Sequence, residues 1–331
     1  MGATFEVFHV GNGFSALWSF GDADDTHMLV DINVPEAVQT GGEEKDNRLD
    51  VIDELKKRIT KTVVVSGRRR KYLDILVISH PDEDHLRGVK ELADEFEIGE
   101  LWETGLRRED DPDVGEGYED FVRLAEQLRK RSRLRRLRAG DEPITKIGEV
   151  EIFCLFPIGK TDDEDEAIPN NASLVLKVVC GGMSVLLPGD SGHDSWREIL
   201  GRFKKSRSLL RSHVLNASHH GSRSFFREDV QQDPYLHGLD AIAPEKVFVS
   251  CRPPDYSSDQ PPHKDAIEIY VKQVGKENLF FTHICGVIKL SEQEDGSWKV
   301  VCGEKEKRDD GKKAAAVVIG STRRTSERTF G

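Results

Sequence analysis

The chain of 331 residues is predicted to adopt an α/β fold. Short segments of apolar, β-prone residues alternate with segments whose apolar residues recur at helical spacing, and a coarse order of strands followed by a helix occurs twice. In both halves, apolar strands are followed directly by Asp or His residues. A chain of this length forms two domains or one large α/β unit, and it is long enough to bury a substantial core.

The first half of the chain is expected to open with three short strands. The alternating apolar residues of 5–10 are followed by Gly11-Asn12-Gly13, a strong turn signal. In 49–59 the apolar residues fall on one side of a helix, with charged residues between them. We therefore expect strands at 5–10, 15–20, 27–32 and 75–78 and helices at 49–59 and 89–96.

The second half is expected to contain more strands than helices. The apolar residues within 121–128 mark one further helix that ends the first half. We then expect helices at 195–203 and 264–274 and strands at 149–155, 173–179, 184–188, 213–217, 246–250, 279–283, 286–290 and 298–301. From Gly303 onward the chain is rich in charged residues, so 304–331 is interpreted as a polar C-terminal tail.

Charge is distributed unevenly along an acidic chain. Its 48 Lys and Arg against 60 Asp and Glu give a net charge of −12, which does not indicate nucleic-acid binding by the whole surface. Two basic runs, Arg129–Arg138 and Arg202–Arg211, stand out. The first is either a phosphate-binding patch or a helix end followed by a solvated strand, with Leu134 and Leu137 packed inward. We favour the helix end and strand.

The cysteines and the N-terminus indicate the cellular compartment in which the protein is expected. Five cysteines are scattered through apolar, strand-like surroundings without a Cys-x-x-Cys pair, so we expect small core residues in a reducing compartment and no disulfide framework. The N-terminus lacks the basic and apolar regions of a secretory signal. No apolar run approaches the ~20 residues that cross a bilayer. We expect a cytoplasmic protein without a membrane partner.

Ligand-type side chains follow three of the predicted strands. They are His80, Asp82, Asp84 and His85 after the strand at 75–78, Asp190 after the strand at 184–188, and His219 with His220 after the strand at 213–217. A strand of the core does not need Asp or His directly after it in order to fold. A two-metal centre needs about three to four N or O ligands per ion and a bridging carboxylate. These three loops supply that set of ligands.

The segment HPDEDHLRG at 80–88 resembles the His-x-His-x-Asp-His signature of the metallo-β-lactamase superfamily. It is most similar to the ComEC-type competence branch, here without the membrane channel of those relatives. FHVGNG, PNNASLVL, LLPGDSG, NASHHGS and THICGVIKL follow in the order and spacing of that branch, across most of residues 4–303. The resemblance implies a four-layer αββα sandwich over residues 1–303.

The resemblance also implies roles for individual residues. His80 and Asp82 would bind one metal ion, while Asp84, His85 and one of His219 and His220 would bind the other, with Asp190 bridging them. Adjacent residues of a strand point to opposite sides, so we expect only one of the two histidines to be a ligand. The implied catalytic residues are Asp84, His220, His263 and Arg87, and the implied substrate contacts or weak ligands are Asn171 and Ser222.

For Asn171, His263 and Asp31 a structural role is an open alternative. Asn171 is either a weak ligand or a turn residue, and His263 is either a phosphate contact or proton donor or part of a helix N-terminus. Asp31, at the end of the strand at 27–32, either hydrogen-bonds a ligand imidazole or serves a turn. Arg87 stands where the branch usually has Gly, which adds a cation beside the expected site.

The expected activity is metal-dependent hydrolysis. Water deprotonated between two divalent ions would attack phosphorus, which makes a phosphodiesterase or nuclease the preferred interpretation. Asp82 in place of His makes the ligand set harder, which favours oxygen-rich substrates and either Zn²⁺ or Mn²⁺. The alternatives are a hydrolase of a small phosphodiester, ester, lactone or thioester, and a non-catalytic metal-binding module that acts through a protein partner, with the tail as a contact.

Overall fold

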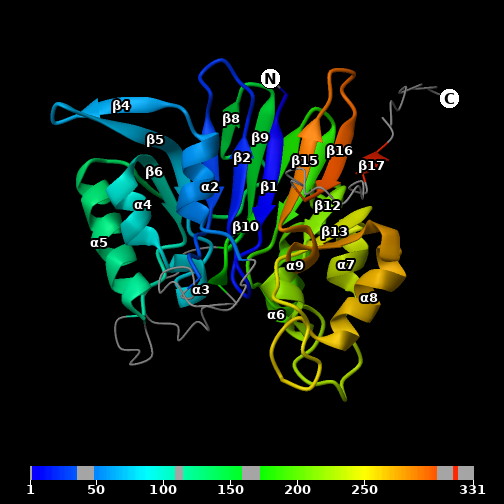
Figure 1. The fold of residues 1–331 in the computed structure, drawn as a ribbon. Coiled ribbons are helices and arrows are strands. Elements are labelled where there is room, and N and C mark those ends of the chain that lie inside the picture. The colour runs from blue at the N-terminus through cyan, green and yellow to red at the C-terminus, as the bar shows by residue number, and fades with distance from the viewer. Residues whose placement is uncertain (1, 36–47, 109–114, 159–171, 304–315, 320–331) are drawn as a thin grey trace, which may run out of the picture.

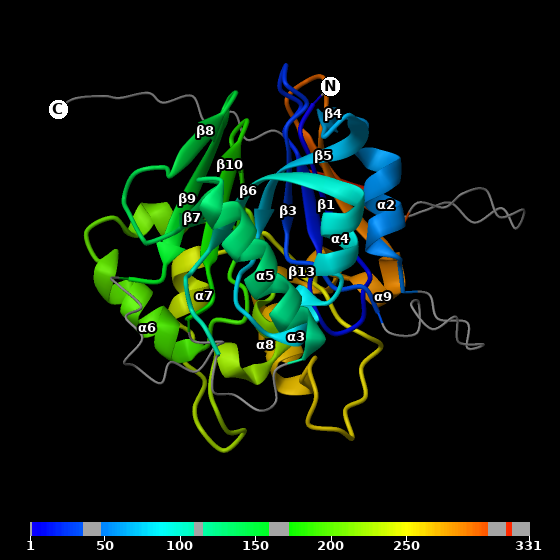
Figure 2. The ribbon, with the colours of Figure 1, turned by 90° about the vertical axis from the view of Figure 1, so that its left-hand side faces the viewer.

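The protein is a four-layer αββα sandwich, in which helices cover the outer faces of two stacked sheets (Figures 1 and 2). The computed structural model describes residues 2–35, 48–108, 115–158, 172–303 and 316–319. Figure 2 shows the layers edge-on, from α6 and α7 through the strands β9 and β10 and then β3 and β1 to α4 and α2. The predicted α/β fold class and sandwich are confirmed.

The larger sheet has ten strands in the order β17-β16-β15-β1-β2-β3-β5-β6-β7, with β4 paired to β5. Its strands are β1 (Thr4–Phe8), β2 (Ala16–Ser19), β3 (His27–Val30), β4 (Thr62–Val65), β5 (Arg68–Val77), β6 (Phe96–Glu103), β7 (Leu134–Arg136), β15 (Val287–Glu292), β16 (Trp298–Cys302) and β17 (Ala316–Ile319). β3, β5, β6 and β7 are parallel neighbours. Their carboxyl ends therefore lie at one edge of the sheet.

The smaller sheet has seven strands in the order β14-β13-β12-β11-β10-β9-β8. They are β8 (Thr145–Ile147), β9 (Val150–Phe156), β10 (Val175–Cys180), β11 (Met183–Leu187), β12 (Val214–Asn216), β13 (Lys246–Val249) and β14 (Leu279–Phe281). β11, β12, β13 and β14 are parallel neighbours. The loops that follow β11 and β12 therefore emerge side by side.

Helices on the two outer faces complete the layers. On the larger sheet lie α2 (Val51–Arg58), α4 (Val89–Glu95) and α5 (Glu116–Lys130), and the short α3 (Glu83–Leu86) precedes α4. The smaller sheet is covered by α6 (His193–Arg202), α7 (His237–Ile242) and α8 (Lys264–Val274). The four-residue α9 (Thr282–Cys285) links β14 to β15.

Strands buried on both faces separate three layers of core. On β5, Ile75 and Val77 face the smaller sheet, whereas Leu76 packs beneath the helices. On β11, Val185 and Leu187 face the larger sheet, and Leu186 packs against the helices of its own side. This explains the continuous apolar runs at 75–77 and 185–187, because both faces of each strand are buried there.

The structure contains elements that were not predicted, among them β6, β8 and α7. The hairpin of β4 and β5, which turns at Ser66-Gly67 with positive φ at both residues, was not predicted. The expected strand at 279–283 ends at Phe281, where α9 begins. Within the segment expected as a polar tail, Ala316–Ile319 forms β17 and pairs antiparallel with β16.

The basic run at 129–138 lies at the end of α5 and on β7, as the favoured interpretation predicts. Leu137 is buried between the sheets, and Leu134 packs against the helix-side core. The neighbouring strand β6 presents three glutamates that contact these arginines: Arg131 and Arg133 pair with Glu97, Arg135 with Glu100, and Arg136 with Glu103. Four of the seven basic residues of this run are therefore paired with carboxylates of the same sheet.

The expectation of five free cysteines is wrong for two of them. Cys285, at the end of α9, is joined by a disulfide to Cys302, at the end of β16, because the pairing of β15 with β16 brings these two chain positions together. Cys154, Cys180 and Cys251 are buried and free, as predicted. Among the described residues, none of the helices combines the length and the apolar character needed to cross a membrane.

Candidate metal centre

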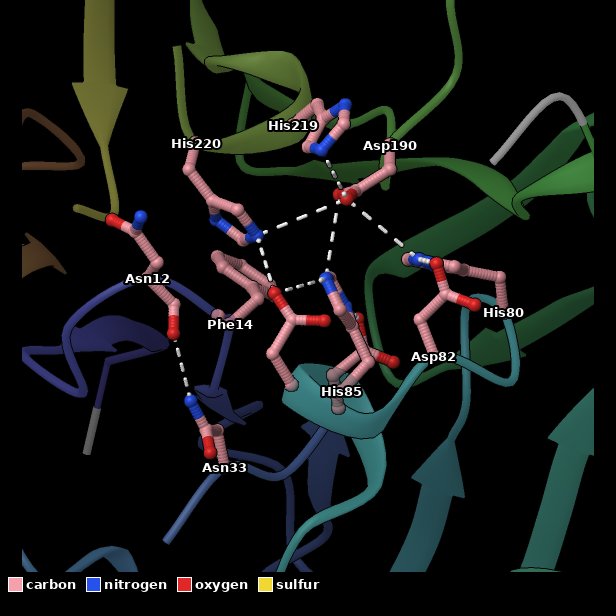
Figure 3. A network of polar contacts seen from close by, with 12 residues as sticks. Asn12, Phe14, Asn33, His80, Asp82, His85, Asp190, His219 and His220 are labelled. Atoms are coloured by element: carbon pink, nitrogen blue, oxygen red, sulfur yellow. Dashed lines mark hydrogen bonds and ion pairs between the residues drawn. The ribbon is translucent and has the colours of Figure 1, made fainter. Parts of the chain in front are cut away.

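The ends of four strands bring the predicted ligands to one edge of the sandwich. The larger sheet contributes Asp31 after β3 and the segment 80–85 after β5, and the smaller sheet contributes Asp190 after β11 and His219 with His220 after β12. Figure 3 shows that the side chains labelled there from both sheets, His80, Asp82, His85, Asp190, His219 and His220, point toward one another. The backbone also joins the two sheets here, since the N–H of Leu174 donates to the carbonyl of Ser79 at 2.8 Å.

Asp190 lies at the centre of the cluster. Its Oδ1 is 3.4 Å from His85 Nε2, and its Oδ2 is 3.6, 3.7 and 3.8 Å from the Nε2 atoms of His219, His80 and His220. Its backbone N–H is held by the Ser173 hydroxyl at 3.1 Å. One buried carboxylate is therefore surrounded by four imidazole nitrogens, each slightly too far away for a strong hydrogen bond.

Two groups of side chains within this cluster have the composition of cation sites. Their ligand atoms lie within 4.8 Å of one another, and the groups are His80 with His85 and Asp190, and Asp84 with His85 and His220. Asp84 Oδ2 lies 3.2 Å from His220 Nε2 and 3.9 Å from His85 Nε2. The structure thus brings together the three residues that were expected to bind one ion.

Asp82 joins the cluster on the side of His80. Its Oδ2 lies 3.5 Å from His80 Nε2, and its Oδ1 accepts a hydrogen bond from Arg108 Nη1 at 2.6 Å. Arg108 follows the end of β6, and its backbone N–H donates to the hydroxyl of Tyr118 at the start of α5. A guanidinium that the sequence did not single out therefore holds one of the predicted ligands.

Asp31 orients the ligand segment, residues 80–85. Its Oδ2 is 2.7 Å from His85 Nδ1 and accepts a hydrogen bond from the Ser79 hydroxyl at 2.6 Å. Its Oδ1 accepts from the backbone N–H of Ser79, also at 2.6 Å. The Ser79 hydroxyl in turn lies 3.0 Å from His80 Nδ1. An imidazole that donates Nδ1–H to a carboxylate keeps its lone pair on Nε2. Of the two roles left open for Asp31, the imidazole contact is present.

The loop after β12 overturns the expectation that His219 and His220 point to opposite sides. The strand ends at Asn216, and both histidines have left-handed backbone angles, with φ of 47° and 55°. Strand alternation therefore does not apply, and both Nε2 atoms turn toward Asp190 Oδ2. Such a backbone is costly for residues with a Cβ, and this cost is usually accepted at functional sites.

The turn Gly11-Asn12-Gly13 packs beneath Asp84. The N–H of Phe14 donates to the Asp84 carbonyl at 3.4 Å, and the Gly13 carbonyl accepts from the Ser250 hydroxyl at 2.8 Å. Asn33 reaches across to donate to the Asn12 carbonyl at 2.9 Å (Figure 3). Gly13 has φ of +124°, and a Cβ there would lie 2.6 Å from the Asp84 carbonyl oxygen. Only glycine permits this close approach.

Burial and opposite charges shift the pKa values of the cluster in opposing directions. Burial alone would lower the pKa of His85, but the carboxylates of Asp190, Asp31 and Asp84 raise it well above its ordinary value. Burial alone would raise the pKa of Asp190, but the imidazoles of His219, His85 and His220 bring it well below its ordinary value. The pKa of His219 is lowered because burial outweighs the attraction of Asp190.

These residues fit divalent cations. The Nε2 atoms of His80 and His85 are buried and make no hydrogen bond, although Asp190 lies within 3.7 Å of each. Buried polar atoms without partners are rare in folded proteins. A set of imidazole nitrogens and carboxylate oxygens that face one another across such gaps is the donor set of Zn²⁺ and Mn²⁺ sites.

The remaining predicted site residues lie outside this cluster of contacts. Arg87 ends α3, and its Nε is 3.6 Å from Glu83 Oε1. The Ser222 hydroxyl accepts from the N–H of Ser224 at 3.3 Å. His263 lies at the N-cap of α8 next to the histidine loop, where its N–H donates to the Gly221 carbonyl. Asn171 lies outside the described residues.

Sequence reasoning missed Arg108 and Ser79. Ser79 directly precedes His80, so its hydroxyl was a readable candidate for holding the ligand segment. Arg108 carries no such signal, because 26 positions separate it from Asp82 and the contact depends on how the chain returns after β6.

The chain is similar in sequence to a known family and to two curated proteins. The sequence model of the family described as the Metallo-beta-lactamase superfamily matches residues 53–232. ComE operon protein 3 of Bacillus subtilis (strain 168) is 28% identical over 165 residues, which are 49% of this chain and 19% of that protein. Competence protein ComA of Neisseria gonorrhoeae is 27% identical over 222 residues, which are 67% of this chain and 24% of that protein.

Both curated relatives are thus much longer than the matched segments, which span 19% and 24% of their lengths. Among solved structures, Igni18, a metallo hydrolase from the hyperthermophilic archaeon Ignicoccus hospitalis, is similar with a TM-score of 0.45 and 15% identity. That match covers 84% of this chain and 94% of the Igni18 chain. Because the family match covers more than half of the sequence, this chain belongs to the metallo-β-lactamase superfamily.

Proposed function

We propose that this protein is a metal-dependent phosphodiesterase that uses two divalent ions, Zn²⁺ or Mn²⁺. The observation that carries the proposal is the convergence of four imidazole Nε2 atoms on the two oxygens of Asp190, at 3.4 to 3.8 Å. Side chains arranged only for stability would hydrogen-bond at shorter distances and would not leave two buried nitrogens without partners.

The proposed ligands form two groups around Asp190. Asp84, His85 and His220 would hold one ion, and His80 and Asp82 would hold the other. His219 and His220 both face Asp190 Oδ2, and since His220 groups with Asp84 and His85, His219 would complete the second group. Asp190 would bridge the two ions.

The residues around the ligands determine how the centre would work. Bound divalent ions would lower the pKa of water and polarise a phosphoryl oxygen. Asp31 keeps the lone pair of His85 on Nε2 and fixes the plane of its ring. Arg108 restrains Asp82 through Oδ1 and leaves Oδ2 facing His80, and it places a positive charge next to the site where negative charge would develop.

Phosphodiesters suit this site better than other esters. Asp82, which occupies the position of a superfamily histidine, makes the ligand set harder and favours phosphoryl oxygens. One relative is named a competence protein, and the competence branch that the chain resembles supports nucleic acid as the polymeric phosphodiester. We therefore propose a nuclease as the finer assignment.

A small phosphodiester is the second candidate substrate. The observation in its favour is the pairing of Arg131, Arg133, Arg135 and Arg136 with the glutamates of β6, which leaves less free charge for a polynucleotide backbone. An affinity for nucleic acid would then have to come from other basic side chains around the candidate metal centre.

Turnover and metal content test the proposal together. The purified chain with Mn²⁺ or Zn²⁺ is expected to bind two ions and to cleave both DNA and bis(p-nitrophenyl) phosphate. Asp84→Ala combined with His85→Ala should abolish cleavage, because both residues belong to one ligand group. The matched control replaces the exposed Asp233 and His237 by alanine and should keep full activity.

Each other outcome selects a different function. Cleavage of bis(p-nitrophenyl) phosphate without cleavage of any nucleic acid would favour the small substrate. Fewer than two bound ions with no turnover of either substrate would contradict the enzyme and leave a metal-binding module that acts through a protein partner.

A further inference from the structure

A second polar site lies beside the histidine loop, in a cavity of about 260 Å³. Arg223, Tyr256, His263 and Lys264 are among its lining residues, together with the acidic Asp265 and Glu268. Two hydrogen bonds connect it to the loop that carries His219 and His220: the N–H of His263 donates to the Gly221 carbonyl, and the N–H of Arg223 donates to His263 Nδ1, both at 3.1 Å. The lining of the cavity is therefore hydrogen-bonded to the loop that carries two of the candidate ligands.

His263 directs a hydrogen-bond donor toward this cavity. Because Nδ1 accepts from the backbone of Arg223, the neutral ring carries its proton on Nε2. The side chain is only 8% exposed, and Nε2 makes no hydrogen bond. Its nearest recorded polar neighbour is Asp259 Oδ1 at 3.4 Å. A buried N–H without a partner at the N-terminus of α8 is suited to an anion.

Arg223 supplies a positive charge at the same place. Its Nη1 donates to the same Asp259 Oδ1 at 2.8 Å, so one carboxylate oxygen lies between the guanidinium and the imidazole. Asp265 holds Arg223 from the other side, with Oδ1 at 3.5 Å from Nε, while its Oδ2 accepts from Arg227. Arg223 is thus oriented by Asp265 and presents its outer nitrogens to Asp259.

Asp259 is the exposed member of this group. Its side chain is 87% exposed, whereas Arg223 and His263 are mostly buried. An exposed carboxylate on a loop gains little from such an ion pair, so another anion can displace it at low cost. Carboxylate and phosphate oxygens are recognised by the same Arg geometry. The contact with Asp259 shows that these two donors can share one anionic oxygen.

We propose that Arg223 and His263 form a subsite for a phosphate that neighbours the scissile phosphodiester, and that Asp259 occupies this subsite in the absence of substrate. The identity of the anion rests on the proposed phosphodiesterase function. Tyr256, which is 52% exposed at the same cavity, offers a ring on which a nucleobase would stack. The substrate would therefore carry at least two phosphates, as an oligonucleotide does.

Opposite effects of two substitutions test this subsite. The probe is a fluorescein-labelled hexathymidylate, and its dissociation constant for the full chain is measured by anisotropy in EDTA, so that cleavage plays no part. Arg223→Met is expected to weaken binding about 10-fold, since a charge-assisted bond is lost. Asp259→Asn should tighten binding about 3-fold, because the competing carboxylate is neutralised.

The controls separate binding from folding and from net charge. Asp233→Asn makes the same change of net charge at an exposed position outside the subsite, and the dissociation constant should not change. Arg223→Lys, which keeps the charge, should lie between Arg223→Met and the unaltered protein. A purely structural ion pair predicts that Arg223→Met and Asp259→Asn both weaken binding, and that result would overturn the proposal.

Equal affinities for all variants would overturn it as well. Turnover of bis(p-nitrophenyl) phosphate by the unaltered protein reports separately on the proposed function, because this substrate has a single phosphate. If that turnover is absent while the two substitutions still shift binding in opposite directions, the phosphodiesterase assignment fails and the anion subsite stands.

Discussion

The carboxylate of Asp31 lies 2.7 Å from Nδ1 of His85, and both side chains are almost completely buried. This pair joins the end of β3 to the ligand segment that follows β5. Since the same carboxylate also accepts two hydrogen bonds from Ser79, it fixes the start of the ligand segment and the ring of His85 together. The candidate metal centre thus depends on a contact within the larger sheet.

Replacing Asp31 by Asn should weaken metal binding without unfolding the protein. Asn tolerates the left-handed φ of 56° at this position, but it lacks the charge that favours Nδ1–H on His85. Loss of such a partner typically lowers metal affinity about 10- to 100-fold. Calorimetric titration with Zn²⁺ measures the change. Asp25→Asn, which alters another Asp–His pair beside His27, should have no effect on affinity.

The roles of Arg108 and Arg87 can be separated by paired substitutions. Arg108→Met removes the donor to Asp82 Oδ1 and should lower kcat/KM by about 10-fold or more, because Asp82 loses its orientation. Arg87→Met removes only a half-exposed contact with Glu83 and should cost less than about 3-fold. Steady-state kinetics on bis(p-nitrophenyl) phosphate provide the comparison. A larger loss for Arg87→Met would restore the role that the sequence assigned to Arg87.

Gly13→Ala should damage both stability and the metal centre. The new Cβ would clash with the Asn33 side-chain amide and would lie 2.6 Å from the Asp84 carbonyl oxygen, in a backbone conformation that disfavours side chains, at a cost of about 2–4 kcal/mol in the free energy of unfolding. Gly67→Ala isolates the backbone cost, because Gly67 also has positive φ but has open space around it. It should cost only about 1–2 kcal/mol in urea unfolding. Equal losses would show that the close approach of Gly13 to Asn33 and Asp84 is unimportant.

Lys177 should make stability depend on pH above neutrality. This residue of β10 donates to the carbonyls of Leu209 and Arg211, and burial lowers its pKa from 10.5 to about 8. Between these two values the unfolded chain binds the proton that the folded chain has lost, so Lys177 destabilises the fold less as the pH rises from about 8 to 10.5.

Lys177→Met removes this titration. The difference in free energy of unfolding between the unaltered protein and Lys177→Met should be constant below pH 7 and should then shift toward the unaltered protein up to about pH 10. Urea unfolding across this range measures it. A difference that is flat, or that moves the other way, would show that burial does not lower the pKa of Lys177.

Much of this protein is determined by local sequence. Strands such as 75–78 and 184–188 are apolar on both faces, which requires burial between other layers, and the Asp and His residues directly after them can only lie in loops at a sheet edge. The order His80, Asp82, Asp84, His85 and the later Asp190 could therefore be recognised as one candidate centre. Local signals of this kind depend on residues only a few positions apart.

Contacts between distant residues were decided by the tertiary structure. The left-handed turn that aims both His219 and His220 at Asp190, the reach of Arg108 to Asp82, the disulfide between Cys285 and Cys302, and the balancing of Arg131–Arg136 by the glutamates of β6 all depend on packing between separate segments. The same is true of Arg223, whose partner Asp259 is 36 positions away. A sequence pattern specifies which faces are buried, whereas the direction of a side chain in a loop depends on backbone angles set by the packing around it.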